Sequence, residues 1–255
     1  MEPILPRAVL WDMDGTLIDS ANYHWITWRD SLAELGFALT PEIFRSWFGS
    51  RNDRILRQMF PDMPDDEVKR VGDLKEARYR ALVRKDGIEL LPGVGMWLER
   101  LHAAGWRQAV ASSAPPANID VLIDVLELGD ILQAAVSAEE VPHGKPAPDV
   151  FLRAAAKLGV DPHRSVVVED AAVGVEAGRR GGMRTIGIAG AHGPLEADVV
   201  VASMTDLPPD AFDRLVPADS QAQGIDQVTQ AIAQTEKVTR ARRPRPKRAP
   251  QPPKS

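Results

Sequence analysis

The sequence predicts an α/β protein: a Rossmann-like, doubly wound parallel sheet with an all-helical domain inserted after its first strand. The first observation is a short apolar run, residues 8–11, which is typical of a buried parallel strand and ends at two aspartates. The second is that residues 20–85 show helical spacing of apolar side chains and no strand candidate. The third is the alternation of amphipathic stretches and short apolar runs from Val94 onward, which is the pattern of βαβ units.

The inserted domain is expected to contain four helices. They cover residues 21–35 with Gly36 as the stop, 41–48 with Thr40 as the cap, a stretch through Ile55 and Met59, and 65–85. Four aromatic side chains are interpreted as the core of this insert rather than as a platform on which a ligand stacks: Trp25, Trp28, Trp47 and Phe48.

Helices and strands alternate in the rest of the chain. The expected helices are residues 94–104, 117–126, 149–158 and 171–180, and the expected strands are 106–112, 134–138, 166–168, 185–189 and 198–201. On this basis residues 1–18 and 86–215 form the sheet domain, and residues 19–85 form the insert. Residues 216–255 are basic and rich in proline, so we expect a disordered tail with at most a short helix over 225–232.

Composition limits the classes of function. The 255 residues are 44% hydrophobic and 26% charged, as in an ordinary soluble globular protein. The absence of cysteine excludes disulfides, thiolate nucleophiles and thiolate metal sites. No apolar stretch approaches the roughly 20 residues of a membrane span. We therefore expect a soluble, cytoplasmic protein without membrane contact, most simply a monomer.

The net charge of −5 is unevenly distributed. Residues 217–255 contain eight Lys or Arg and three Asp or Glu, so the tail carries +5 and the remainder of the chain −10. A basic tail attracts phosphate groups without sequence preference. This one has no aromatic side chains on which bases could stack, so we interpret it as a solvated tail and expect no nucleic-acid partner.

Six polar side chains stand at the carboxyl ends of four different predicted strands or just after them: Asp12 and Asp14, Ser112, Lys145, and Glu169 with Asp170. The carboxyl ends of parallel strands meet at one edge of a sheet, where ligands bind in open α/β folds. Residues more than 150 positions apart in the sequence are therefore expected to converge at one site.

The converging charges are chemically reasonable only with a cation present, because several carboxylates in one cleft cannot all ionise unaided. Mg²⁺ fits best, since it binds through one or two carboxylates together with a phosphate and keeps several waters. Lys145 adds a charge suited to a phosphate oxygen, and Ser112 adds a hydroxyl donor. In such a site one carboxylate can attack phosphorus and form an aspartyl-phosphate while another moves a proton.

Together the motifs resemble the four signature motifs of the haloacid dehalogenase superfamily of phosphohydrolases: Asp12-Met-Asp14-Gly-Thr16, Ser112, Lys145-Pro146 and Glu169-Asp170. They occur in the same order, over residues 8 to roughly 215, and the helical insert stands where a small (C1) cap follows the first motif. Within the superfamily the chain is similar to subfamily I, the branch that holds β-phosphoglucomutase and small sugar-phosphate phosphatases.

The resemblance implies roles for residues at matching positions. Asp12 would be the nucleophile and Asp14 the general acid and base. Ser112 and Lys145 would hold the transferring phosphoryl group. The implied Mg²⁺ ligands are Asp12, the backbone carbonyl of Asp14, Asp170, and Glu169 directly or through water.

The cap, residues 19–85, would choose the substrate, and its candidates remain open. His24 matches a hinge histidine of sugar-phosphate enzymes, although a lone helix histidine can be purely structural. Arg51 matches a cap arginine that clamps a distal phosphate or sugar, against a solvated arginine that begins a helix. Lys75 either faces the cleft or is solvated. The candidate substrate-binding residues are Thr16, His24, Gly49, Arg51, Lys75 and Ser113.

The resemblance thus implies a Mg²⁺-dependent phosphatase that acts on a small phosphorylated metabolite, most simply a sugar phosphate. A first alternative is a phosphosugar mutase of the β-phosphoglucomutase type, which shares the core residues and passes the phosphoryl group to a sugar hydroxyl instead of water. A second alternative is a binding or regulatory protein that works through its basic tail. The sequence does not decide between phosphatase and mutase, whereas the complete set of catalytic positions argues against the second alternative.

Overall fold

A six-stranded, all-parallel sheet forms the centre of the protein. The computed structural model describes residues 5–47, 51–190 and 193–218, and the structural statements concern this part of the chain. The strand order is β3-β2-β1-β4-β5-β6, with strands β1 (Ala8–Trp11), β2 (Arg107–Ser112), β3 (Ala134–Ser137), β4 (Ser165–Glu169), β5 (Arg184–Ile188) and β6 (Val199–Val201). The central strand β1 pairs with β2 and β4, so that Trp11 lies opposite Val110 and Val168. The predicted fold class is confirmed.

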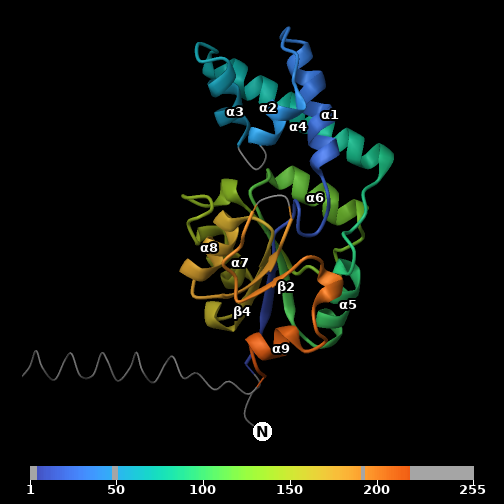
Figure 1. Cartoon of the computed structure of the whole chain (residues 1–255), viewed down its shortest axis with the longest axis vertical. Coiled ribbons are helices and arrows are strands. Elements are labelled where there is room, and N and C mark those ends of the chain that lie inside the picture. Colours follow the sequence, from blue (N-terminus) through green and yellow to red (C-terminus); the bar gives the residue numbers. More distant parts are fainter. Residues whose placement is uncertain (1–4, 48–50, 191–192, 219–255) are drawn as a thin grey trace, which may run out of the picture. The chain divides into compact units, whose positions relative to one another are not determined.

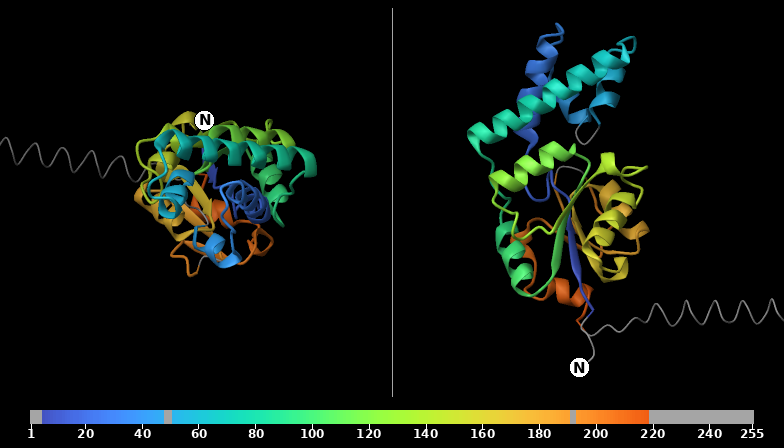
Figure 2. Two further views of the ribbon diagram at one scale, coloured as in Figure 1. Left: turned by 90° about the horizontal axis from the view of Figure 1, so that it is seen from above. Right: turned by 180° about the vertical axis from the view of Figure 1, so that it is seen from behind.

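Each face of the sheet is covered by its own group of helices. Successive strand residues point to opposite faces, and accordingly Val9 and Trp11 belong to one core cluster while Ala8 and Leu10 belong to another. The first cluster includes α5 (Val94–Ala103), α6 (Pro116–Val125) and α9 (Ala211–Leu215), and the second includes α7 (Asp149–Leu158) and α8 (Ala172–Arg180). Figure 2 shows α5 and α7 on opposite sides of the strands, which is the doubly wound arrangement.

The segment after β1 consists of helices α1 (Ala21–Ala33), α2 (Pro41–Trp47), α3 (Asn52–Met59) and α4 (Asp65–Asp86), with no strand among its described residues. We call these four helices the cap. Trp28 and Trp47 are buried in a cap cluster with Leu32 and Leu56, and Trp25 packs edge-on against Phe44. Phe48 lies outside the described residues. Helix α4 lies against α6 of the sheet domain, so the cap covers the carboxyl ends of the strands (Figure 1).

The sequence missed the short helix α9. Its five residues make fewer than two turns, which is too short for a periodic apolar pattern. Phe212 of α9 fills a space between Trp11, Trp97 and Trp106, with ring centroids 5.0–6.3 Å apart. Of the expected tail, residues 216–218 are described, and Val216 is buried in the first core cluster, so the start of the tail was predicted too early. Residues 219–255, with the expected helix over 225–232, lie outside the described residues, and the proposed division into core, cap and tail stays a prediction. No helix in the described part of the chain has the length and apolarity needed to cross a membrane.

Candidate active site

The ends of the strands bring together four charged side chains: Asp12, Lys145, Glu169 and Asp170. Asp12 directly follows β1, Glu169 ends the neighbouring strand β4, and Asp170 comes next. The Asp12 amide continues the ladder by donating to the carbonyl of Val168 at 3.0 Å, which holds the two strand ends in register. Carboxylate oxygens of Asp12, Glu169 and Asp170 all lie within 4.8 Å of one another. Lys145, from the loop after β3, donates to Asp12 and, at 2.7 Å, to Glu169.

The charges in this cluster are buried and unbalanced. Burial raises the pKa of Asp12 well above its ordinary value; the ammonium of Lys145 opposes this, while the charges of Glu169 and Asp170 add to it. Burial alone would favour the neutral amine of Lys145, but Asp12 and Glu169 raise its pKa and keep it charged. One ammonium therefore faces three carboxylates.

The turn after β1 requires a glycine. Gly15 has a φ of +87°, in the left-handed region that favours glycine, and its amide donates to the carbonyl of Ile18 at 2.8 Å. A Cβ at Gly15 would lie 2.1 Å from Oδ2 of Asp170. The bare backbone of this turn is what allows Asp170 to approach the cluster. Thr16 is fully buried, its hydroxyl has no partner among the described residues, and it does not line the cleft.

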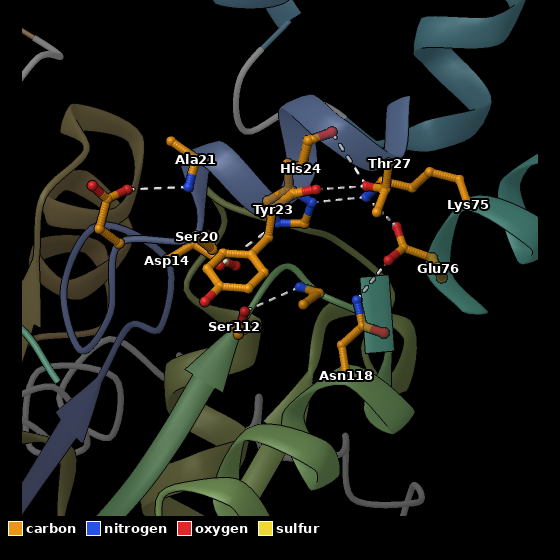
Figure 3. A network of polar contacts seen from close by, with 12 residues as sticks. Asp14, Ser20, Ala21, Tyr23, His24, Thr27, Lys75, Glu76, Ser112 and Asn118 are labelled. Carbon is orange, nitrogen blue, oxygen red and sulfur yellow. Dashed lines mark hydrogen bonds and ion pairs between the residues drawn. The ribbon is translucent and has the colours of Figure 1, made fainter. Parts of the chain in front are cut away.

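The carboxylate of Asp14 is not part of the group of three carboxylates, and it lies beside Ser20 and His24 (Figure 3). It accepts a hydrogen bond from the hydroxyl of Ser20, and its Oδ1 lies 3.7 Å from Nε2 of His24. The other ring nitrogen of His24, Nδ1, lies 2.8 Å from Nζ of Lys75. An ammonium can only donate, so Nδ1 accepts and the ring proton lies on Nε2, facing Asp14. The His24 ring also stacks on Tyr79, with centroids 4.4 Å apart.

Neighbouring polar groups in this row shift one another's pKa values. Burial would raise the pKa of Asp14, but the hydrogen bonds from His24 and Ser20 lower it below its ordinary value. Burial and the charge of Lys75 lower the pKa of His24. Burial also lowers the pKa of Lys75, against the opposing charge of Glu76. Two carboxylates of one motif, Asp12 and Asp14, thus have pKa values shifted in opposite directions, as expected for residues with different chemical roles.

Lys75 is not solvated, because only 2% of its side chain is exposed and it contacts both His24 and Glu76. The interpretation of Lys75 as a solvated lysine was therefore wrong. Arg51 is exposed: it immediately precedes α3, and its side chain pairs with Asp53 at 3.2 Å. Gly49 lies outside the described residues.

A cleft of about 1130 Å³ lies between cap and sheet domain. The predicted site residues that line it are Asp12, Asp14, His24, Arg51, Lys75, Ser112, Ser113, Lys145, Glu169 and Asp170. Ser112 is buried and its hydroxyl accepts from the amide of Ala114 at 3.0 Å, while Ser113 is exposed in the cleft. Among the described residues, every predicted site residue except Thr16 therefore lines one continuous cleft.

The cleft also contains polar residues that sequence reasoning missed. Glu76 is buried beside Lys75 and accepts hydrogen bonds from Asn52 of α3 and Asn118 of α6. No motif contains these three residues. In the sequence Glu76 looks like the other charged residues of this helix. Only the packing of α4 against α6 shows that Glu76 is buried, so the other charged residues are not a guide to its position.

Comparisons with known proteins agree with this geometry. Residues 9–188, more than half of the chain, match the family model described as haloacid dehalogenase-like hydrolase. The chain is 29% identical over 208 residues to a Bacillus subtilis protein named beta-phosphoglucomutase, covering 79% of this chain and 91% of that protein. It is 30% identical over 207 residues to hexitol phosphatase B of Escherichia coli, covering 78% and 93%. The crystal structure of CbbY from Rhodobacter sphaeroides in complex with phosphate superposes with a TM-score of 0.76 at 25% identity, covering 82% and 100%.

Proposed function

The chain belongs to the haloacid dehalogenase-like hydrolase family, and on that premise we propose that it is a Mg²⁺-dependent phosphatase of a small sugar phosphate. The observation that carries the proposal is the buried group of Asp12, Lys145, Glu169 and Asp170 at the floor of a cleft roofed by the cap. An ammonium beside three buried carboxylates in a cleft under the cap suits the binding and transfer of a phosphoryl group.

Asp12 and Asp14 divide the chemistry between them. A carboxylate oxygen of Asp12 forms a bond to phosphorus as the bond to the leaving oxygen breaks, and Asp14 gives that oxygen its proton. A water then attacks the aspartyl-phosphate and loses its proton to Asp14, so that inorganic phosphate leaves and both carboxylates return to their starting states. Lys145 and Ser112 hold the oxygens of the phosphoryl group during both transfers. The lowered pKa of Asp14 favours its carboxylate, which is the form that accepts the proton of the attacking water in the second step.

The donor set fits a hard divalent cation. Three buried carboxylates lie within 4.8 Å of one another, and the single charge of Lys145 does not balance them. All available ligand atoms are oxygens, which favours Mg²⁺. Asp12, Asp170, the backbone carbonyl of Asp14 and Glu169, directly or through water, would hold it. When bound, the ion supplies positive charge that neutralises the phosphoryl oxygens and the carboxylates.

The substrate class rests on the relatives and on the cap. Proteins named beta-phosphoglucomutase and hexitol phosphatase align over at least 78% of this chain, which supports a phosphorylated sugar or sugar alcohol. His24, Lys75 and Arg51 give the cap side of the cleft cationic or hydrogen-bonding groups, as a polyhydroxyl substrate requires. Arg51 becomes available for a substrate when it exchanges its exposed pair with Asp53.

A mutase is the second candidate, favoured by the alignment with beta-phosphoglucomutase. It would use the same groups but deliver the phosphoryl group of Asp12 to a sugar hydroxyl instead of water. The basic tail lies outside the described residues, and we keep the expectation of a cytoplasmic monomer without a nucleic-acid partner as part of the proposal.

The experiment that tests the function is a ³¹P NMR time course with Mg²⁺ and a panel of sugar phosphates, including β-glucose 1-phosphate with a trace of the 1,6-bisphosphate. Growth of inorganic phosphate from one or a few members is the expected result. Conversion of the 1-phosphate to the 6-phosphate without free phosphate would identify a mutase instead. If no member of the panel changes, the proposal of a sugar-phosphate enzyme is wrong.

Replacing Gly15 by alanine is expected to raise the Mg²⁺ concentration needed for half-maximal activity by about tenfold or more, the scale on which ligand displacement weakens metal sites. The new Cβ would fall 2.1 Å from Asp170 and force this carboxylate out of the cluster. The measurement is a Mg²⁺ titration of phosphate release. Gly36→Ala is the matched control, because Gly36 also has a positive φ, +75°, but no atom lies within 4 Å of its Cβ position. An unchanged Mg²⁺ requirement in Gly15→Ala would contradict the assignment of Asp170.

A further inference from the structure

Glu76 is a buried carboxylate that joins three elements. Its Oε1 accepts hydrogen bonds from Asn52 of α3 at 2.7 Å and from Lys75 of α4 at 2.8 Å, and its Oε2 accepts from Asn118 of α6 at 2.6 Å. Only 8% of its side chain is exposed. A charge this deeply buried is stable only when it is paired and fully hydrogen-bonded, and Glu76 has both kinds of partner.

Asn118 connects this carboxylate to the sheet domain. It lies at the start of α6, six residues after Ser112, and it is almost completely buried. Its Nδ2 donates to Glu76, and its Oδ1 accepts from Nη1 of Arg80 at 2.9 Å. The opposite orientation of the amide would place its oxygen against a carboxylate and its nitrogen against a guanidinium, so the two cap residues fix its direction. Two residues of helix α4, one turn apart, thus hold a single residue of α6.

Glu76 is also the first member of a row that ends at Asp14, as Figure 3 shows. Lys75 lies between Glu76 and His24, and His24 lies between Lys75 and Asp14. Within the described residues, the ammonium of Lys75 forms its ion pair with the carboxylate of Glu76. Without that partner a buried ammonium is uncompensated, and it relaxes by moving or by losing its proton. Either change would release His24 from its position beside Asp14.

We propose that Glu76 is a positioning residue that couples the docking of the cap to proton transfer at Asp14. Through Asn118 it fixes helix α4 on α6, and through Lys75 and His24 it fixes the carboxylate that protonates the leaving oxygen. Glu76 itself does not touch the reacting atoms. The inference rests on the proposed function, because it needs Asp14 as the general acid.

The test compares two substrates in Glu76→Gln, which keeps the size of the side chain and removes its charge. With the sugar phosphate identified by NMR, kcat is expected to fall about 10- to 100-fold, part of what a general acid contributes. With p-nitrophenyl phosphate, whose leaving group departs as a stable anion and needs no proton, the single-turnover rate of p-nitrophenolate release is expected to change less than about threefold. This rate follows the first transfer alone and not the later hydrolysis, which also uses Asp14. Glu67→Gln on the same helix is the control: Glu67 pairs with Arg70 outside the cleft, and both activities are expected to stay unchanged.

A second pair of variants distinguishes a positioning role of Glu76 from a nonspecific loss of structure. Asn118→Asp sets a carboxylate against Glu76 and is expected to show the same substrate-selective loss. The double variant Glu76→Gln with Asn118→Asp restores the hydrogen bond between cap and core with donor and acceptor exchanged. It is expected to recover part of the activity toward the sugar phosphate relative to Glu76→Gln alone, a coupling that a double-mutant cycle measures.

The outcomes distinguish the inference from the function on which it rests. An equal loss with both substrates, or no loss with either, overturns the positioning role of Glu76 while the proposed function stands. If Glu76→Gln does not fold, as judged by circular dichroism, the same comparison in Asn118→Ala decides, and an equal loss there overturns the inference as well. A wild-type chain that releases phosphate from neither substrate refutes the proposed function itself.

Discussion

Replacing Asp12 by asparagine is expected to lower the rate of phosphate release by about 10³-fold or more, which corresponds to ~4 kcal/mol of activation free energy. An amide oxygen is a poor nucleophile toward phosphorus, so the aspartyl-phosphate cannot form at this position. The fold should survive, because Lys145 keeps its pair with Glu169 and the crowding of three buried carboxylates is relieved. The unfolding temperature is therefore expected to stay within about 5 °C of the wild-type value.

Phosphate release and trapping of the phosphorylated chain by rapid acid quench measure this effect. Asp213→Asn is a matched control, because Asp213 makes an exposed pair with Arg7 and does not line the cleft. If Asp12→Asn kept more than about a tenth of the wild-type rate, a covalent intermediate on Asp12 would be refuted. A large loss of both activity and unfolding temperature would instead mean that Asp12 acts mainly as a structural charge.

The floor of the site was predictable because it follows from topology. Asp12 and Glu169 each stand at the carboxyl end of an apolar run, and in a parallel sheet those ends must share an edge. Lys145 could be placed there for the same reason, since its loop follows β3. The local sequence determines where each strand ends. The register of β1 with β4 then determines how close Asp12 and Glu169 lie to each other.

The wall of the site could not be predicted in this way. Whether Lys75 and Glu76 face solvent or the cleft depends on which side of α4 packs on α6, and that is decided by contacts between distant segments. Asn118 illustrates the same limit, because its role appears only when Glu76 and Arg80 of the cap helix α4 approach it. In addition, no general rule places functional residues at a particular position of a helix, as topology does for the carboxyl ends of parallel strands. The local sequence pattern was therefore enough to predict the reaction centre. The supporting residues Lys75, Glu76 and Asn118 could be identified only from the tertiary packing.

Replacing Lys145 by methionine is expected to abolish phosphate release and to lower the free energy of unfolding of the metal-free protein by about 3 kcal/mol, the usual cost of removing one partner of a buried ion pair. Methionine preserves much of the apolar stem but leaves Asp12 and Glu169 buried without their shared cation. Added Mg²⁺ is expected to recover part of this loss and to stabilise the variant more than the wild type, because the ion supplies the missing positive charge.

Urea unfolding in EDTA and in excess Mg²⁺ measures both effects. Lys157→Met is the control: Lys157 makes a half-exposed pair with Glu140, so its loss should cost no more than about 1 kcal/mol and show no dependence on Mg²⁺. Adding Asp12→Asn to Lys145→Met removes one of the uncompensated charges and should return part of the lost stability, so that the two substitutions are not additive. Additive losses, or a Lys145→Met variant as stable in EDTA as the wild type, would mean that the carboxylates of Asp12 and Glu169 do not depend on Lys145. The phosphoryl group would then have to be held by other cations of the cleft, and Lys145 would lose its place in the mechanism.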